Sequence, residues 1–127
     1  MYSCKEQEVA LKLGVFLAKN FKGECNLVGI EGDTFVNVSS KHFELLFTVC
    51  DTNKKTCIKI EEILVKKPYR NKGLCTEIMK TIKTVAKIEQ ITIGLWCDKN
   101  NKRLFNFYSR LGFRYIETLD DDWLEYN

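Results

Sequence analysis

The sequence is poor in the residues that build metal sites and disulfide frameworks. It contains a single histidine, His42, and a single proline, Pro68. Its six cysteines include no C-x-x-C pair and stand apart from the histidine, so the spacing that is typical of zinc sites is missing. We therefore expect no bound metal, and we expect the cysteines to be free thiols in a reducing compartment.

Long apolar runs are also missing. No stretch of about 18 or more apolar residues occurs, and the first residues are charged and polar where a signal peptide would be hydrophobic. These absences predict a soluble, cytoplasmic protein with no membrane partner. The sequence also has no linker-like segment and no internal repeat. A length of 127 residues with 45% hydrophobic content is enough to form a single hydrophobic core. We expect a single domain over residues 1–127, as a monomer or a homodimer.

The net charge of +3 is small, but the charges are segregated along the chain. Basic residues outnumber acidic ones between Lys66 and Arg110, and acidic residues dominate from Phe113 to Asn127. The middle of the chain therefore favours anions and the tail favours cations. No nucleic-acid recognition motif accompanies the lysines, which argues against RNA or DNA as a binding partner.

The apolar pattern predicts a mixed α/β sheet. Helical periodicity occurs over residues 5–21, 73–88 and 101–111. The predicted strands are short segments at residues 26–30, 34–39, 43–50, 57–65, 91–96, 113–117 and 123–126. A polar turn joins the third and fourth strands as an antiparallel hairpin, whereas the helix that follows the fourth strand predicts a parallel pair with the fifth.

The stretch PYRNKGLC, residues 68–75, predicts an anion-binding turn. Pro68 has no N–H and ends the preceding strand. Asn71 tolerates unusual backbone angles, Gly73 lets the main chain approach a ligand, and the next helix directs its unpaired N–H groups outward. Arg70 and Lys72 add positive charge, which gives the design of a phosphate-binding strand–loop–helix turn. The stretch matches neither a P-loop nor a dinucleotide fingerprint.

Two motifs together resemble the GNAT superfamily of acetyl-CoA-dependent N-acetyltransferases. The sequence V-K-K-P-Y-R-N-K-G-L-C, residues 65–75, resembles its pyrophosphate loop, whose pattern is [RQ]-x-x-G-x-[GA]. The sequence N-K-R-L-F-N-F-Y-S-R-L-G-F, residues 101–113, resembles its motif N-x-x-x-x-x-F-Y-x-x-x-G-F. Within this superfamily, the residues of these segments are most similar to those of the spermidine/spermine acetyltransferases. Cys75 stands where the family has Gly or Ala, Asn71 stands where Gly is frequent, and the usual strand before the first helix is missing.

The resemblance implies a single-domain GNAT-like α/β (α+β) fold with a mixed, mostly antiparallel sheet, acetyl-CoA as co-substrate and a primary amine as acceptor. It implies that residues 63–65 pair with the pantetheine arm, that the amides of residues 70–75 hold the pyrophosphate, and that the strands carrying Val65 and Trp96 part to admit the co-substrate. The implied cofactor-binding residues are Ile63, Leu64, Val65, Arg70, Asn71, Lys72, Gly73, Leu74, Cys75, Thr76 and Asn101. Asn101 is also a candidate helix cap.

Direct acetyl transfer needs a base for the amine and a proton for the leaving thiolate. Because side chains alternate along a strand, only one of Glu61 and Glu62 is expected to face the cleft. Glu61 shares parity with Ile63 and Val65, and the resemblance places a carboxylate there, so we predict Glu61 as the base, with Glu62 or a water as alternatives. The resemblance assigns Tyr108 to the leaving sulfur.

Three questions stay open at this point. A ping-pong route through Cys75 or Cys97 is a rival mechanism. A catalytically degenerate GNAT scaffold that binds CoA or a protein, such as an inhibitor, is a rival function. The acceptor is a small polyamine-like amine, a protein lysine or N-terminus, or an RNA, and the acidic residues 120–122 together with Glu125 are expected to face a cationic acceptor.

Overall fold

The structure is a computed structural model that describes residues 4–52, 55–98, 100–116 and 122–127. In chain order the elements are α1 (Cys4–Asn20), β1 (Glu24–Ile30), β2 (Asp33–Ser39), β3 (Phe43–Thr52), β4 (Lys55–Val65), η1 (Lys67–Tyr69), α2 (Leu74–Glu89), β5 (Thr92–Trp96), α3 (Lys102–Arg110), β6 (Arg114–Tyr115) and β7 (Trp123–Tyr126). The strands form one seven-stranded sheet in the order β1-β2-β3-β4-β5-β7-β6. Only β4 and β5 are parallel among these neighbours, which confirms the predicted mixed, mostly antiparallel sheet.

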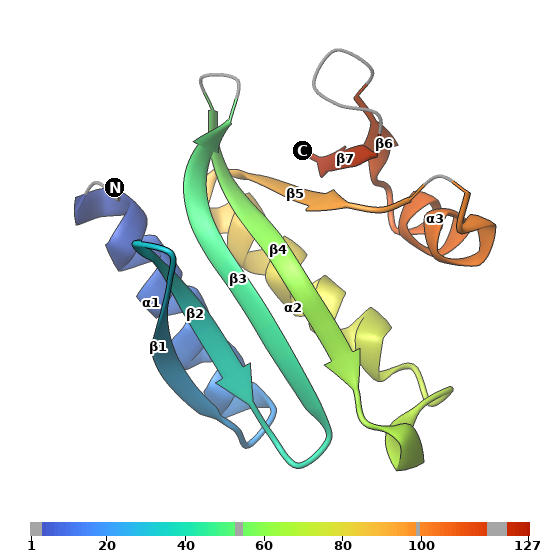
Figure 1. The fold of residues 1–127 in the computed structure, drawn as a ribbon, viewed down its shortest axis with the longest axis horizontal. Helices are drawn as coiled ribbons and strands as arrows, with labels where there is room; N and C mark the ends of the chain where they lie inside the picture. The colour runs from blue at the N-terminus through green and yellow to red at the C-terminus, as the bar shows by residue number, and fades with distance from the viewer. Residues whose placement is uncertain (1–3, 53–54, 99, 117–121) are drawn as a thin grey trace.

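Helices α1 and α2 lie on the same face of the sheet, behind β1 to β4 in Figure 1. Helix α1 turns Val9, Leu13 and Leu17 towards the strands, and their spacing of four residues forms one apolar stripe. Gly14 lets the helix approach closely, because a Cβ there would lie 2.7 Å from Val36. The core therefore lies between this helical layer and one face of the sheet.

Helix α2 contributes a second apolar stripe to the same core. Its buried residues are Ile78, Met79, Ile82 and Ala86. They pack in one cluster with buried side chains of β2, β3 and β4. Among the described residues, no helix covers the other face of β2, β3 and β4, which we call the open face (Figure 1).

The predicted helices and strands are confirmed, with small shifts at their ends. The predicted strand over residues 26–30 begins two residues earlier, at Glu24. The strand predicted over residues 113–117 is only Arg114–Tyr115 in the described part of the chain. Residues 120 and 121 of the acidic tail lie outside the described residues. In the part of the chain that the structure describes, no helix has the length and apolar character needed to cross a membrane.

Candidate active site

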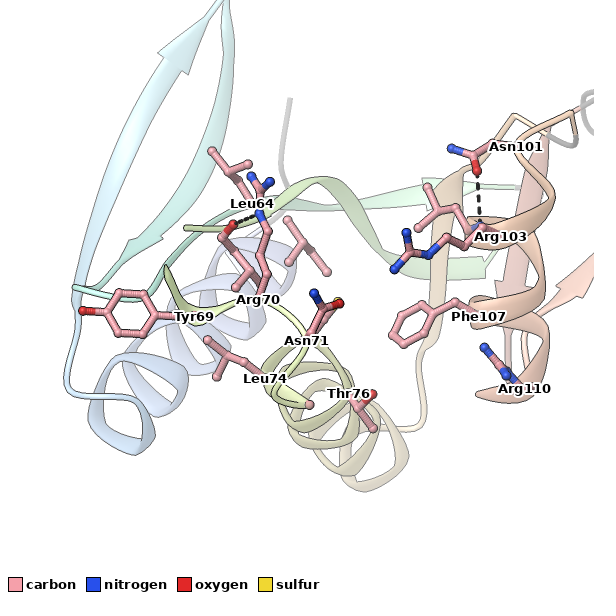
Figure 2. Close-up of a pocket in the computed structure, with 15 residues that line it drawn as sticks. Leu64, Tyr69, Arg70, Asn71, Leu74, Thr76, Asn101, Arg103, Phe107 and Arg110 are labelled. Carbon is pink, nitrogen blue, oxygen red and sulfur yellow. Dashed lines mark hydrogen bonds between the residues drawn. The ribbon is translucent and has the colours of Figure 1, made fainter. Parts of the chain in front are cut away.

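A cavity of about 590 Å³ opens beside the C-terminal end of β4. This volume lies within the range of small-molecule binding sites, about 300–1,000 Å³. Figure 2 shows side chains of the loop after β4 and of α2 on one side, and side chains of α3 on the other. The lining residues are Ile63, Leu64, Val65, Tyr69, Arg70, Asn71, Gly73, Leu74, Cys75, Thr76, Asn101, Arg103, Leu104, Phe107 and Arg110.

The cavity forms where β4 and β5 part. Their parallel ladder joins Cys57, Ile58, Lys59 and Ile60 to the residues from Thr92 onwards. Beyond Ile60 the two strands are no longer paired, while β4 remains paired with β3 as far as Val65. Over residues 61–65, the edge of β4 that faces β5 is therefore not paired with β5, although the carbonyl oxygen of Val65 is taken by Arg70. The resemblance implied such a parting of these two strands.

The loop between β4 and α2 has the backbone geometry that its sequence predicts. Strand β4 ends at Val65, and Pro68 lies in the short helix η1. Asn71 and Gly73 have positive φ angles of 63° and 79°. A Cβ at Gly73 would have no neighbour within 4 Å, so the missing side chain leaves space beside the main chain.

The start of α2 supplies hydrogen-bond donors to the cavity. Gly73 is the N-cap residue and offers no side-chain cap. The first N–H groups of an α-helix have no partner within the helix, and the positive end of the helix dipole lies there. Leu74, Cys75 and Thr76 line the cavity, so their amides and this dipole make it suitable for an anion.

Arginine side chains make the cavity positively charged. Arg70, Arg103 and Arg110 line it, and no Asp or Glu is among its described lining residues. The Nε of Arg70 donates to the carbonyl oxygen of Val65 at 2.8 Å, which ties the loop to the end of β4 (Figure 2). Lys72, which the sequence also predicted as a cofactor-binding residue, is exposed and does not line the cavity.

Helix α3 provides two cations that the sequence prediction missed. Arg103, Phe107 and Arg110 are four and three residues apart, so they share one helix face. That spacing was visible in the sequence, but it does not indicate which cavity the face lines. Asn101 was predicted correctly as a cap: its Oδ1 accepts a hydrogen bond from the amide of Leu104 at 3.3 Å.

Tyr108 lies behind this wall of the cavity. Its ring packs edge-on against Phe107 and Phe113, and only 8% of the residue is exposed. Burial, with smaller contributions from Cys75 and Cys97, raises the pKa of Tyr108 well above its usual value. The phenol is therefore protonated at neutral pH and can donate a proton or a hydrogen bond.

Glu61 occupies an irregular position that the sequence did not reveal. The ladder between β3 and β4 pairs Leu46 with Glu62 but Phe47 with Ile60. Glu61 is therefore the extra residue of a β-bulge, which interrupts the alternation of side chains along β4.

The bulge overturns the parity argument for Glu61. Ile63 and Val65 pair with buried residues of β3 on the helix-covered face. The carboxylate of Glu61 instead lies 3.2 Å from the ammonium of Lys59, whose neighbours Ile58 and Ile60 are buried on the covered face. The side chain of Glu61 therefore lies on the open face. Its role as the base stays a prediction.

A second cavity, also of about 590 Å³, has Glu61 among its lining residues. Its lining residues are Glu6, Gln7, Gly32, Asp33, Thr34, Phe35, Thr48, Cys50, Lys59 and Glu61. Three of these are acidic and one is basic, so the charge balance is opposite to that of the first cavity. Within the described ranges, no three His, Cys, Asp or Glu side chains form a group that could hold a metal ion.

Residues 35–113 match the Acetyltransferase (GNAT) family. An uncharacterized N-acetyltransferase of Methanocaldococcus jannaschii is 33% identical to the chain over 85 residues. The match covers 61% of this chain and 37% of that protein, so the chain spans little more than a third of the relative's length.

Solved structures have a similar fold at low sequence identity. Arabidopsis thaliana Naa50, in complex with the bisubstrate analogue CoA-Ac-MVNAL, superimposes with a TM-score of 0.58 and 17% identity, covering 99% of this chain and 82% of that one. An acetyltransferase of the GNAT family from Staphylococcus aureus gives a TM-score of 0.55 and 18% identity, covering 99% and 95%. At these identities the likeness concerns the fold, and it confirms the predicted acyl-CoA N-acyltransferase fold.

Proposed function

Because the chain belongs to the GNAT family of acetyltransferases, we propose that it transfers the acetyl group of acetyl-CoA to a primary amine in a direct, ternary-complex reaction. The observation that carries this proposal is the position of the cationic cavity. It joins the free edge of β4 to the start of α2, so that one ligand can contact both.

The first cavity suits acetyl-CoA in shape and charge. The main chain of residues 63–65 pairs with the amide groups of the pantetheine arm, since this edge of β4 is not paired with β5 and the ligand can displace the Arg70 side chain from the carbonyl of Val65. The amides of residues 71–75 bind the pyrophosphate at the helix N-terminus, because the amide of Arg70 donates to Lys67. Arg70, Arg103 and Arg110 add charge-assisted hydrogen bonds to phosphate oxygens. Asn101 borders the same cavity and contributes to the pantetheine site.

The proposed chemistry assigns proton removal from the amine to Glu61 and proton donation to the leaving thiolate to Tyr108. An alkyl amine with a pKa near 10.4 is ionised at pH 7, and forming its neutral state costs about 4–5 kcal/mol. Glu61 takes this proton and passes it to water. The nitrogen then attacks the thioester carbonyl and loses its second proton to water through Glu61 as the C–S bond breaks. Tyr108 donates its proton to the leaving thiolate, and the phenol is reprotonated from solvent.

The acceptor is a cationic amine, either a small polyamine-like molecule or a protein lysine or N-terminus. Glu61 and Glu62 are exposed on β4, and acidic side chains outnumber basic ones among the residues that line the cavity beside Glu61. Opposite charge attracts a protonated amine to this side and cannot retain the anionic co-substrate there. The complex of Naa50 with a bisubstrate analogue supports the view that a fold of this kind can hold both substrates.

A second candidate function is binding of CoA or of a protein without catalysis. One observation favours it: neither Glu61 nor Tyr108 lines the cavity that suits acetyl-CoA. The two functions separate in one experiment, in which the protein is incubated with acetyl-CoA and a panel of amines, proteins and RNAs while free CoA is measured. Binding of acetyl-CoA without release of CoA supports the second function.

The co-substrate site is tested by titration calorimetry with acetyl-CoA. Arg103→Ala should weaken binding about tenfold, because a charge-assisted hydrogen bond contributes about 1.5 kcal/mol. Lys102→Ala is the matched control, since Lys102 does not line the cavity. Gly73→Glu should weaken binding more than Gly73→Ala, because both strain the positive φ but only glutamate adds negative charge. Equal affinities in each pair would show that the site is elsewhere.

The catalytic assignment is tested by steady-state kinetics. Glu61→Gln should lower kcat most at neutral pH and recover in part at alkaline pH, where neutral amine is abundant. Glu62→Gln is the matched comparison, and a larger loss in that variant would move the base to Glu62. Tyr108→Phe should lower kcat with little change in acetyl-CoA affinity. An unchanged pH profile for Glu61→Gln would remove Glu61 from the mechanism.

A further inference from the structure

An exposed tryptophan stands on the open face where β4 and β5 part. Trp96 is the last residue of β5, and 48% of it is exposed. It follows Leu95, which pairs with Ile60 as the last pair of this ladder, so Trp96 lies where the unpaired stretch of β4 begins at Glu61. The indole therefore offers an exposed aromatic surface beside the point where the two strands part.

The ring of Trp96 is held in place by a second tryptophan. Trp96 and Trp123 pair across β5 and β7, and their ring centroids lie 5.0 Å apart at an interplanar angle of 66°. The indole N–H of Trp123 donates to Glu125 at 2.8 Å, and both residues are buried. Gly94 makes this arrangement possible, because a Cβ at that position would collide with the ring of Trp123.

Carboxylates of β4 and β7 lie on the same face of the sheet as this aromatic pair. Glu61 contacts Lys59 on the open face, and Glu62 pairs with Leu46, whose neighbours in β3 are buried on the covered face. Glu125 of β7 pairs with Gly94, which is itself paired with Lys59. The carboxylates of Glu61, Glu62 and Glu125 and the ammonium of Lys59 therefore lie on the same face of the sheet as the exposed indole.

We propose that the indole face of Trp96 binds the ammonium-bearing end of the acceptor by a cation–π contact and that Trp96 is a specificity-determining residue for cationic acceptors. An indole is the strongest of the aromatic side chains in this role, and an ammonium gains about 0.5–2 kcal/mol over it. Glu61 and Glu62 supply the opposite charge, while Trp123 and Gly94 position the ring. This inference rests on the proposed acetyl transfer in identifying the ligand as the acceptor. Binding of a cation at Trp96 does not itself require catalysis.

The binding test uses two probes that differ in charge and hardly in shape. Choline carries a quaternary ammonium that cannot be acetylated, and 3,3-dimethylbutan-1-ol carries a neutral tert-butyl group in its place. In NMR titrations of the backbone amides, choline should bind roughly 2- to 30-fold more tightly than the alcohol. This preference should decrease in Trp96→Phe and disappear in Trp96→Leu. Equal binding of the two probes, or an unchanged preference in Trp96→Leu, would overturn the proposal.

The kinetic test uses the amine from the panel that is acetylated fastest. The KM for this amine should increase in the order wild type, Trp96→Phe, Trp96→Leu, while the affinity for acetyl-CoA stays unchanged. Ile88→Ala is the control, since Ile88 is 74% exposed on α2, the helix that covers the opposite face. An unchanged KM in an active Trp96→Leu enzyme would overturn the role of Trp96 alone. Failure to acetylate any amine would overturn the proposed function, whereas the choline comparison would still report on the cation site.

Discussion

Burial controls the protonation of the sulfur atoms at the candidate site. Desolvation raises the pKa of Cys75 to about 11, and it raises that of Cys97 together with the nearby Asp122 and Asp98. Both thiols are therefore protonated at neutral pH, and a thiol is a much weaker nucleophile than a thiolate. This environment opposes a ping-pong route through either cysteine and favours direct attack by the amine.

A third thiol links burial to alkaline stability. Cys57 is fully buried, and desolvation is the main cause that raises its pKa to about 12 from 9.0. In the unfolded chain the thiol of Cys57 ionises near pH 9, whereas in the folded chain it stays protonated there. The stability that this thiol contributes is therefore retained below pH 9 and is lost as the pH rises towards 12. We expect the free energy of unfolding to fall by on the order of 1 kcal/mol per pH unit in this window.

The variant Cys57→Ala tests this linkage by urea denaturation between pH 7 and pH 11. It should be less stable than the wild type at pH 7, because it leaves a small cavity beside Gly94 and Trp123. Its free energy of unfolding should nevertheless fall less steeply above pH 9. Parallel curves for the two proteins would show that Cys57 does not titrate differently in the folded state.

At the scale of helices and strands, the fold was largely predictable from local patterns. The apolar periods of α1 and α2 and the turn residues Asn71 and Gly73 are properties of short segments, so one sequence is enough to read them. The bulge at Glu61 depends on how β4 pairs with β3, which no local pattern encodes. The same holds for Arg103 and Arg110, because their place in the cavity depends on how α3 packs beside the loop.

Helix α3 offers a test of one local prediction. Asn101→Ala removes the side-chain oxygen that accepts a hydrogen bond from the amide of Leu104, so it should lower stability by about 1 kcal/mol. Asn106→Ala is the matched control, because Asn106 is an exposed residue within the same helix. Thermal denaturation should show a lower Tm for the first variant and little change for the second. Equal shifts in both would mean that the cap does not stabilise α3.

At the scale of the whole molecule, one sheet separates two surfaces of different character. The helices α1 and α2 cover one face (Figure 1). The cationic cavity lies where β4 and β5 part. The open face carries the carboxylates and Trp96. The anionic acetyl-CoA and the proposed cationic acceptor can therefore approach the same strands from different places, which suits the proposed direct transfer, in which both are bound at once.

A continuous core connects these surfaces, and we propose that residues 1–127 form a single domain. Buried residues from Leu13 in α1 to Leu124 in β7 belong to one cluster. We expect one cooperative unfolding transition, in which far-UV circular dichroism and tryptophan fluorescence coincide. Fluorescence reports on β5 and β7 through Trp96 and Trp123, whereas circular dichroism is dominated by the helices. Acetyl-CoA at 100 times its Kd should stabilise both signals equally, by about 2.7 kcal/mol. Separate transitions, or a stabilisation seen in only one signal, would show that the molecule contains two units that unfold independently. The acetyl-CoA site would then belong to only one of them.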